Sequence, residues 1–208
     1  MSWLKRSLKI LVLSLFAVGA GGVFGQVEWI RDASAATIPA GPVSGQVDGK
    51  TVSALKFGHL DTAGGLELGS PDRQFVHYKI SLQDAEMFFD GKIFANVTVT
   101  VRKGELPYGK TFRRTLAPFL EQPGIRGDGY WVPEFLSLSM QVRKTSMREQ
   151  KPGELGMGTI LSSNFELPFT GRVEFEKRKG DKIPVHLYVC FDDKSKSCLA
   201  GTAEIDIR

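Results

Sequence analysis

Apolar and polar residues alternate along much of the chain, most clearly over residues 93–102. In this segment one set of alternate side chains is apolar and the other is mostly polar, namely Ile93, Ala95, Val97, Val99 and Val101 against Phe94, Asn96, Thr98, Thr100 and Arg102. Successive side chains of a strand point to opposite faces of a sheet. The pattern therefore predicts a strand with one face in a core and the other in water.

The same alternation predicts further strands over residues 75–82, 136–143, 172–176, 185–191 and 199–207. Asp48 and Gly49 lie between two apolar segments and predict a tight hairpin, because both central residues of a type I′ turn need positive φ. The fold class is therefore predicted to be all-β. Eight to ten short strands with polar turns indicate a two-sheet antiparallel β-sandwich, immunoglobulin-like or jelly-roll, with a barrel as the alternative.

Helical patterns compete with this alternation only weakly outside the N-terminal segment. Residues 111–122 could form a short helix that breaks at Pro118. Residues 81–91 could form a helical turn between two strands.

The N-terminal segment has the pattern of a bacterial export signal. Lys5, Arg6 and Lys9 precede an uncharged apolar run over residues 10–25. A small-residue box, Ala33-Ser34-Ala35, predicts removal of residues 1–35, although it lies ten residues beyond the run. The alternative is an uncleaved membrane anchor over residues 10–30, which is short beside the roughly 20 residues that a transmembrane helix needs.

Beyond the signal, residues 36–45 are rich in proline and glycine and are predicted to be a linker, so that the sandwich covers residues 46–208. The domain is then expected outside the cytoplasm, in the periplasm or secreted. Membrane contact is expected only through the N-terminal segment.

The charge of the chain argues against nucleic-acid binding. Removal of residues 1–35 takes away four cations and two anions and lowers the net charge from +4 to +2. Two basic clusters remain, Arg102, Lys103, Lys110, Arg113 and Arg114, and Arg143, Lys144, Arg148 and Lys151. Solvated strand edges explain such clusters, and an anionic glycan, lipid headgroup or acidic partner is the alternative.

The only two cysteines, Cys190 and Cys198, are predicted to form a disulfide. Both fall on the side of their strands opposite the apolar side chains, and a polar loop joins the two strands into a hairpin. An even cysteine count in an exported chain favours a disulfide, because the compartment is oxidising.

The loop over residues 123–134 is the candidate binding site. An exposed Tyr130 and Trp131 beside Arg126 and Asp128 could stack on sugar rings or anchor a protein partner. The competing interpretation is that Trp131 closes one end of the sandwich while the glycines form a tight turn.

The sequence shows no known catalytic motif, and neither a cofactor nor a metal is predicted. We therefore expect a non-enzymatic binding, structural or accessory protein of the cell envelope or a surface assembly, with a protein or glycan partner. The alternative is a hydrolase or metal-dependent enzyme with a site assembled from loops. That alternative requires two or more of the following to meet: His59, His77, Asp84, Glu86 and His186.

Overall fold

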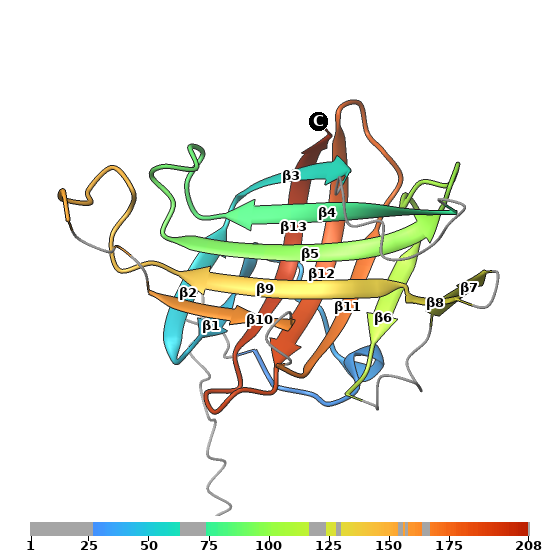
Figure 1. The fold of residues 1–208 in the computed structure, drawn as a ribbon, viewed down its shortest axis with the longest axis horizontal. Coiled ribbons are helices and arrows are strands. Elements are labelled where there is room, and N and C mark those ends of the chain that lie inside the picture. The colour runs from blue at the N-terminus through green and yellow to red at the C-terminus, as the bar shows by residue number, and fades with distance from the viewer. Residues whose placement is uncertain are drawn as a thin grey trace, which may run out of the picture.

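The computed structural model describes residues 27–62, 74–116, 124–127, 130–153, 156, 158–163 and 167–207, and this part of the chain is all-β. Apart from one 3-10 turn, η1 (Ala33–Ala35), its regular elements are strands (Figure 1). They are β1 (Val43–Val47), β2 (Lys50–Leu55), β3 (Phe57–Thr62), β4 (Phe75–Gln83), β5 (Ile93–Arg102), β6 (Thr111–Arg114), β7 (Gly124–Gly127), β8 (Tyr130–Pro133), β9 (Phe135–Val142), β10 (Thr159–Ser162), β11 (Phe169–Phe175), β12 (Lys182–Phe191) and β13 (Cys198–Ile207). Within these residues no helix is long and apolar enough to cross a membrane.

Most strands belong to one sheet that curls over itself. Its order is β10-β9-β5-β4-β3-β13-β12-β11-β6, and β1 and β2 extend from β13. Strand β13 has two partners on one edge, because β1 pairs with its first half and β3 pairs in parallel with its last residues. In Figure 1, strands β4, β5 and β9 cross in front of β11, β12 and β13 at a steep angle.

The main core lies on the inner face of the curled sheet, where the sequence placed it. On β5 the side chains of Ala95, Val97, Val99 and Val101 are buried, and the equivalent positions of β4, β9, β12 and β13 join them in one cluster. The opposite face of β5 is less exposed to solvent than predicted. Phe94 is covered by Phe88 and Arg143, and Thr100 is buried against His77.

The predicted hairpin at Asp48 and Gly49 is confirmed. Both residues have positive φ, 51° and 70°, and the flanking Val47 and Lys50 are cross-strand partners of β1 and β2. Positive φ at both central residues is the mark of a type I′ turn, whose twist matches that of the two strands.

The helix predicted over residues 111–122 is wrong at its start, where the chain forms β6. Pairing with β11 turns Phe112 into the core, where its ring packs edge-on at 5.7 Å from that of Phe175. This long-range contact outweighs local helix propensity. Pro118 lies outside the described residues. Residues 84–90 form bends and turns that include one helical turn, in which the amides of Asp90 and Gly91 donate to the carbonyl oxygen of Met87 (3.0 and 3.3 Å).

The N-terminal boundary of the fold also differs from the prediction. Strand β1 begins at Val43, inside the segment predicted as a linker. Residues 27–38, here called the strap, pack on the outer face of β12 and β13, although residues up to 35 were expected outside the fold. The apolar strap residues are matched by a second small cluster on that face, Tyr188, Cys190, Cys198 and Ala200.

Candidate binding surfaces

The predicted disulfide is present. Cys190 and Cys198 are directly opposite each other on β12 and β13, with their Cα atoms 4.1 Å apart, and the sequence has no other cysteine. They lie on the face opposite the main core, as the alternation predicts. That face is not open to solvent, because the strap covers it and both cysteines are fully buried. The disulfide is therefore a structural element and not an exposed redox centre.

The loop predicted to bind a partner forms a separate two-stranded hairpin of β7 and β8. Arg126 is the cross-strand partner of Trp131, and Gly127 is the partner of Tyr130. Asp128 lies outside the described residues. The hairpin extends from the end of the sheet at which β5 terminates and β9 begins (Figure 1). The role of Arg126, Tyr130 and Trp131 in binding stays a prediction.

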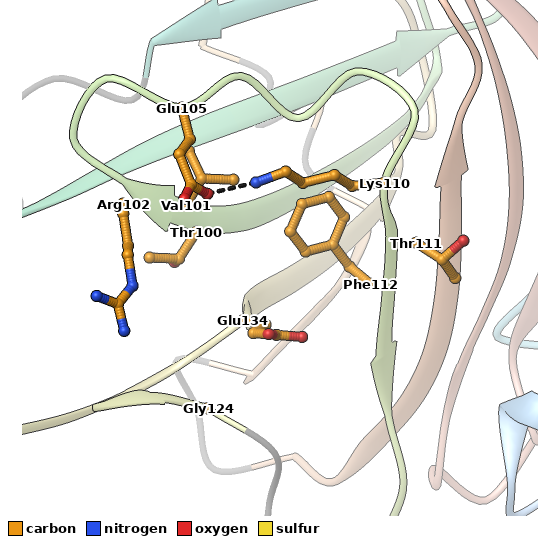
Figure 2. Close-up of a pocket in the computed structure, with 9 residues that line it drawn as sticks. All are labelled: Thr100, Val101, Arg102, Glu105, Lys110, Thr111, Phe112, Gly124 and Glu134. Atoms are coloured by element: carbon orange, nitrogen blue, oxygen red, sulfur yellow. Dashed lines mark hydrogen bonds and ion pairs between the residues drawn. The ribbon is translucent and has the colours of Figure 1, made fainter. Parts of the chain in front are cut away.

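A polar cleft of about 540 Å³ opens where this hairpin joins the sheet. It is lined by the end of β5, the connection from β5 to β6, the start of β6 and the outer ends of the hairpin strands, with Gly124 and Glu134 at the hairpin side (Figure 2). Glu105 and Lys110 form an ion pair across the β5–β6 connection. The hydrogen bond from Lys110 lowers the pKa of Glu105 below its usual value.

The floor of this cleft is fixed by hydrogen bonds. The Thr100 amide donates to the carbonyl oxygen of Glu134 (2.8 Å), and the Thr100 hydroxyl bonds to Nδ1 of His77 (2.9 Å). A hydroxyl next to an imidazole resembles a nucleophile with its base. Thr100 is fully buried, however, so a substrate cannot reach this hydroxyl, and the pair is best explained as structural.

A second surface was missed by the sequence analysis. Met87, Phe88 and Phe89 follow one another on the connection from β4 to β5, and their exposed fractions are 55%, 51% and 53%. Met147, on the connection from β9 to β10, is 43% exposed. These four residues are here called the apolar tip. The available signal was the run Met87-Phe88-Phe89 between Glu86 and Asp90, since a turn cannot bury three consecutive large side chains.

Contacts with the sheet hold the apolar tip in place. The guanidinium of Arg143 lies 4.9 Å from the ring centre of Phe88 and 4.4 Å from that of Phe94. The Arg148 amide donates to the carbonyl oxygen of Phe89 (3.2 Å), which joins the two connections. These connections lie at the end of β5 opposite the polar cleft (Figure 1).

The two basic clusters of the sequence do not form uniform positive patches. Arg114 is partly buried over the ring of Phe169, and burial lowers the pKa of its guanidinium. Arg148 is paired with Asp90 at 3.0 Å. Arg114 is therefore largely withdrawn from an anionic partner and Arg148 is paired at the surface, whereas Arg102, Lys103, Arg113, Lys144 and Lys151 remain exposed.

The residues required by the enzyme alternative have separate local partners. His59 is 3.1 Å from Asp61 on its own strand, and His186 bonds to Glu176 (2.8 Å) and Thr202 (3.0 Å). Asp84 accepts hydrogen bonds from the backbone amides of residues 92 and 93. In the part of the chain that the structure describes, no three His, Cys, Asp or Glu side chains gather as metal ligands.

No protein-family model, curated protein or solved structure matches this chain. Its function is therefore inferred from its own surfaces.

Proposed function

We propose that this protein is an exported, non-enzymatic binding or accessory protein of the cell envelope or a surface assembly, and that its apolar tip binds a protein partner. The exposure of Met87, Phe88, Phe89 and Met147 on two joined connections carries the proposal. Contiguous exposed apolar side chains are costly in water and are typical of interaction sites. Aromatic and methionine side chains are also enriched where proteins meet.

The surroundings of the apolar tip fit the anatomy of a protein interface. Charged pairs border it, Arg148 with Asp90 and Lys92 with Glu149 at 2.8 Å. An apolar centre with a polar rim is the usual arrangement, because the rim excludes water from the contacts at the centre. Arg143 and the backbone hydrogen bond from Arg148 to Phe89 already hold the apolar tip in place. Binding of a partner would therefore cost little conformational entropy in the tip.

The polar cleft supports a second candidate, the binding of a glycan. Its ion-paired Glu105 and Lys110 and the nearby Glu134 offer both donors and acceptors to hydroxyl groups. The β7–β8 hairpin, with Tyr130 and Trp131 in its sequence, adjoins the cleft. Tyrosine and tryptophan are the residue types that stack on sugar rings.

Export rests on the charged and apolar N-terminal pattern and is supported by the disulfide, which persists in oxidising compartments. The location we propose is the periplasm or the cell exterior. We also interpret the curled sheet as an open two-layer sandwich, because among the described residues its end strands β10 and β6 each pair with one neighbour. Pairing between β10 and β6 would instead have closed a barrel.

The decisive experiment compares partner capture by the purified protein and two variants. Phe88→Ser combined with Phe89→Ser removes the centre of the apolar tip. Leu106→Ser is the matched control, since Leu106 has the same exposed fraction as Phe88, 51%, and lies on the β5–β6 connection. Each protein is cross-linked to envelope extract, and the captured proteins are identified by mass spectrometry.

We expect the wild type and Leu106→Ser to capture one and the same protein, and the double variant to lose it. A hot-spot contribution of about 2 kcal/mol corresponds to an affinity loss of about 30-fold. Capture that is equal for all three proteins would overturn the role of the apolar tip. Retention on a glycan array that Lys110→Glu abolishes would favour the cleft and the glycan.

A further inference from the structure

The strap is tied to the outer face of the sheet by specific contacts. The Tyr188 hydroxyl donates to the carbonyl oxygen of Glu28 (2.8 Å) and accepts from the Ile30 amide (2.6 Å). The Trp29 indole donates to the carbonyl oxygen of Phe191 (3.0 Å), and the Lys196 ammonium lies 4.2 Å from the centre of its ring. Residues 27–30 are therefore tied to β12 and the loop that follows it by three hydrogen bonds and one cation–π contact.

The second half of the strap is held in the same way. Asp32 caps the η1 turn by accepting from the Ser34 amide (2.9 Å), and this bond lowers the pKa of the Asp32 carboxyl. Arg172 donates to the carbonyl oxygens of Ser34 and Ala36, at 3.1 Å each. Ala33 and Ala36 are buried against the sheet. The predicted cleavage point after Ala35 thus lies inside a folded segment of the domain.

Removal of residues 1–35 would uncover the second cluster. Val27, Trp29, Ile30 and Ala33 would be lost, and only Ala36 and Ile38 of the apolar strap residues would remain over Tyr188, Cys190, Cys198 and Ala200. The hydroxyl of Tyr188 would also lose both of its backbone partners. A mature chain that begins at Ala36 therefore lacks part of its own fold.

The strap contacts also shorten the segment that is available to form a membrane anchor. A span over residues 10–30 needs Val27, Trp29 and Ile30 in the bilayer, yet these side chains pack against the second cluster. The apolar run that remains, residues 10–25, is 16 residues long, whereas a transmembrane helix needs about 20. A run of this length is instead close to the apolar region of a cleaved signal.

We infer that the export signal is cut upstream of the strap, after Gly22 or Gly25, so that residues 27–38 stay in the mature protein. Ala20-Gly21-Gly22 is a small-residue pattern near the end of the apolar run, and Gly25, with Val23 two positions before it, closes the run. This inference rests on the export that the proposed function includes. It assigns a processing site that the box at residues 33–35 had obscured.

The test expresses the full chain with its own N-terminus in a Gram-negative host and measures cell fraction and intact mass. We expect a periplasmic product that begins at Val23 or Gln26, with cyclised Gln26 counted as the same cut. The double variant Gly22→Leu/Gly25→Leu should accumulate as uncut precursor. Ala35→Leu, which destroys the downstream box at an exposed strap position, should be processed like the wild type.

The outcomes separate this inference from the proposed function. A periplasmic product that begins at Ala36, or one blocked by Ala35→Leu, overturns the inference and leaves export intact. An uncut chain whose domain is accessible to protease in the periplasm overturns it as well. An uncut chain confined to the cytoplasm overturns both the inference and the proposed export.

Discussion

The disulfide gives the most quantitative prediction about stability. In the double variant Cys190→Ala/Cys198→Ala the cross-link is removed and neither substituted position carries a thiol or hydroxyl. The two cysteines are separated by eight positions, and on the chain-entropy model closing so short a loop stabilises the protein by about 2.5 kcal/mol. Loss of two buried sulfur atoms from the second cluster adds up to about 1 kcal/mol.

We therefore expect the free energy of unfolding to fall by about 2.5–3.5 kcal/mol, and Tm to fall by roughly 5–14 °C for a domain of this size. Urea unfolding at neutral pH, followed by tryptophan fluorescence, measures the first quantity, and calorimetry measures the second. The wild type refolded in strong reductant is the control and should match the double variant closely. A loss below about 1 kcal/mol would refute the loop-closure reasoning, and a loss above about 5 kcal/mol would show that the bond supports much more than one hairpin.

Three further predictions concern the strap, a crowded glycine and the acidic pH range. Trp29→Ala should lower the free energy of unfolding by about 1.5–3 kcal/mol and speed reduction of the native disulfide by dithiothreitol, because the half-buried indole and its hydrogen bond are lost; unchanged reduction kinetics would contradict the covering role of the strap. Gly45→Ala should cost more than about 2 kcal/mol, since φ is +147° and a Cβ would lie 2.1 Å from a backbone oxygen of β13, whereas Gly41→Ala, with open space around it, should cost little in the same urea titration. Hydrogen bonds from His186 and Lys179 lower the pKa of Glu176. The ionised carboxylate therefore stabilises the fold above the unfolded pKa of about 4.3, and this stabilisation is lost as pH falls through the lower folded pKa. The difference in unfolding midpoint between wild type and Glu176→Gln should shrink below about pH 4, and a constant difference would contradict this linkage.

Local patterns in the sequence were sufficient for much of the fold. Alternation over residues 93–101 identified the inner face of β5. The Asp48-Gly49 pair identified the hairpin between β1 and β2. The alternation along each strand placed both cysteines on the face opposite the apolar side chains, so that the disulfide could be predicted from the sequence and from strand geometry. These features depend on residues close together in the chain, and the period of a strand encodes them directly.

The sequence left the binding surfaces largely undetermined. It singled out residues 123–134 as a candidate binding loop through their aromatic residues, but predicted neither their pairing as β7 and β8 nor the cleft beside them, because the lining comes from segments as far apart as Thr100 and Glu134. It also missed the apolar tip, since alternation says which side chains a strand buries and nothing about a turn. Whether Phe88 stays exposed depends on what packs near it.

The tertiary structure alone decided what covers each face of the sheet. The two-residue repeat of a strand separates its two faces but does not say which of them is exposed to water. The outer face at Tyr188 and Cys190 is buried because the strap lies on it. Likewise, the β6 segment is a strand because β11 supplies its hydrogen-bond partners, which no window of neighbouring residues contains. Burial and pairing join residues more than 160 positions apart, as in the bond from Trp29 to Phe191, so they become visible only when the chain is folded.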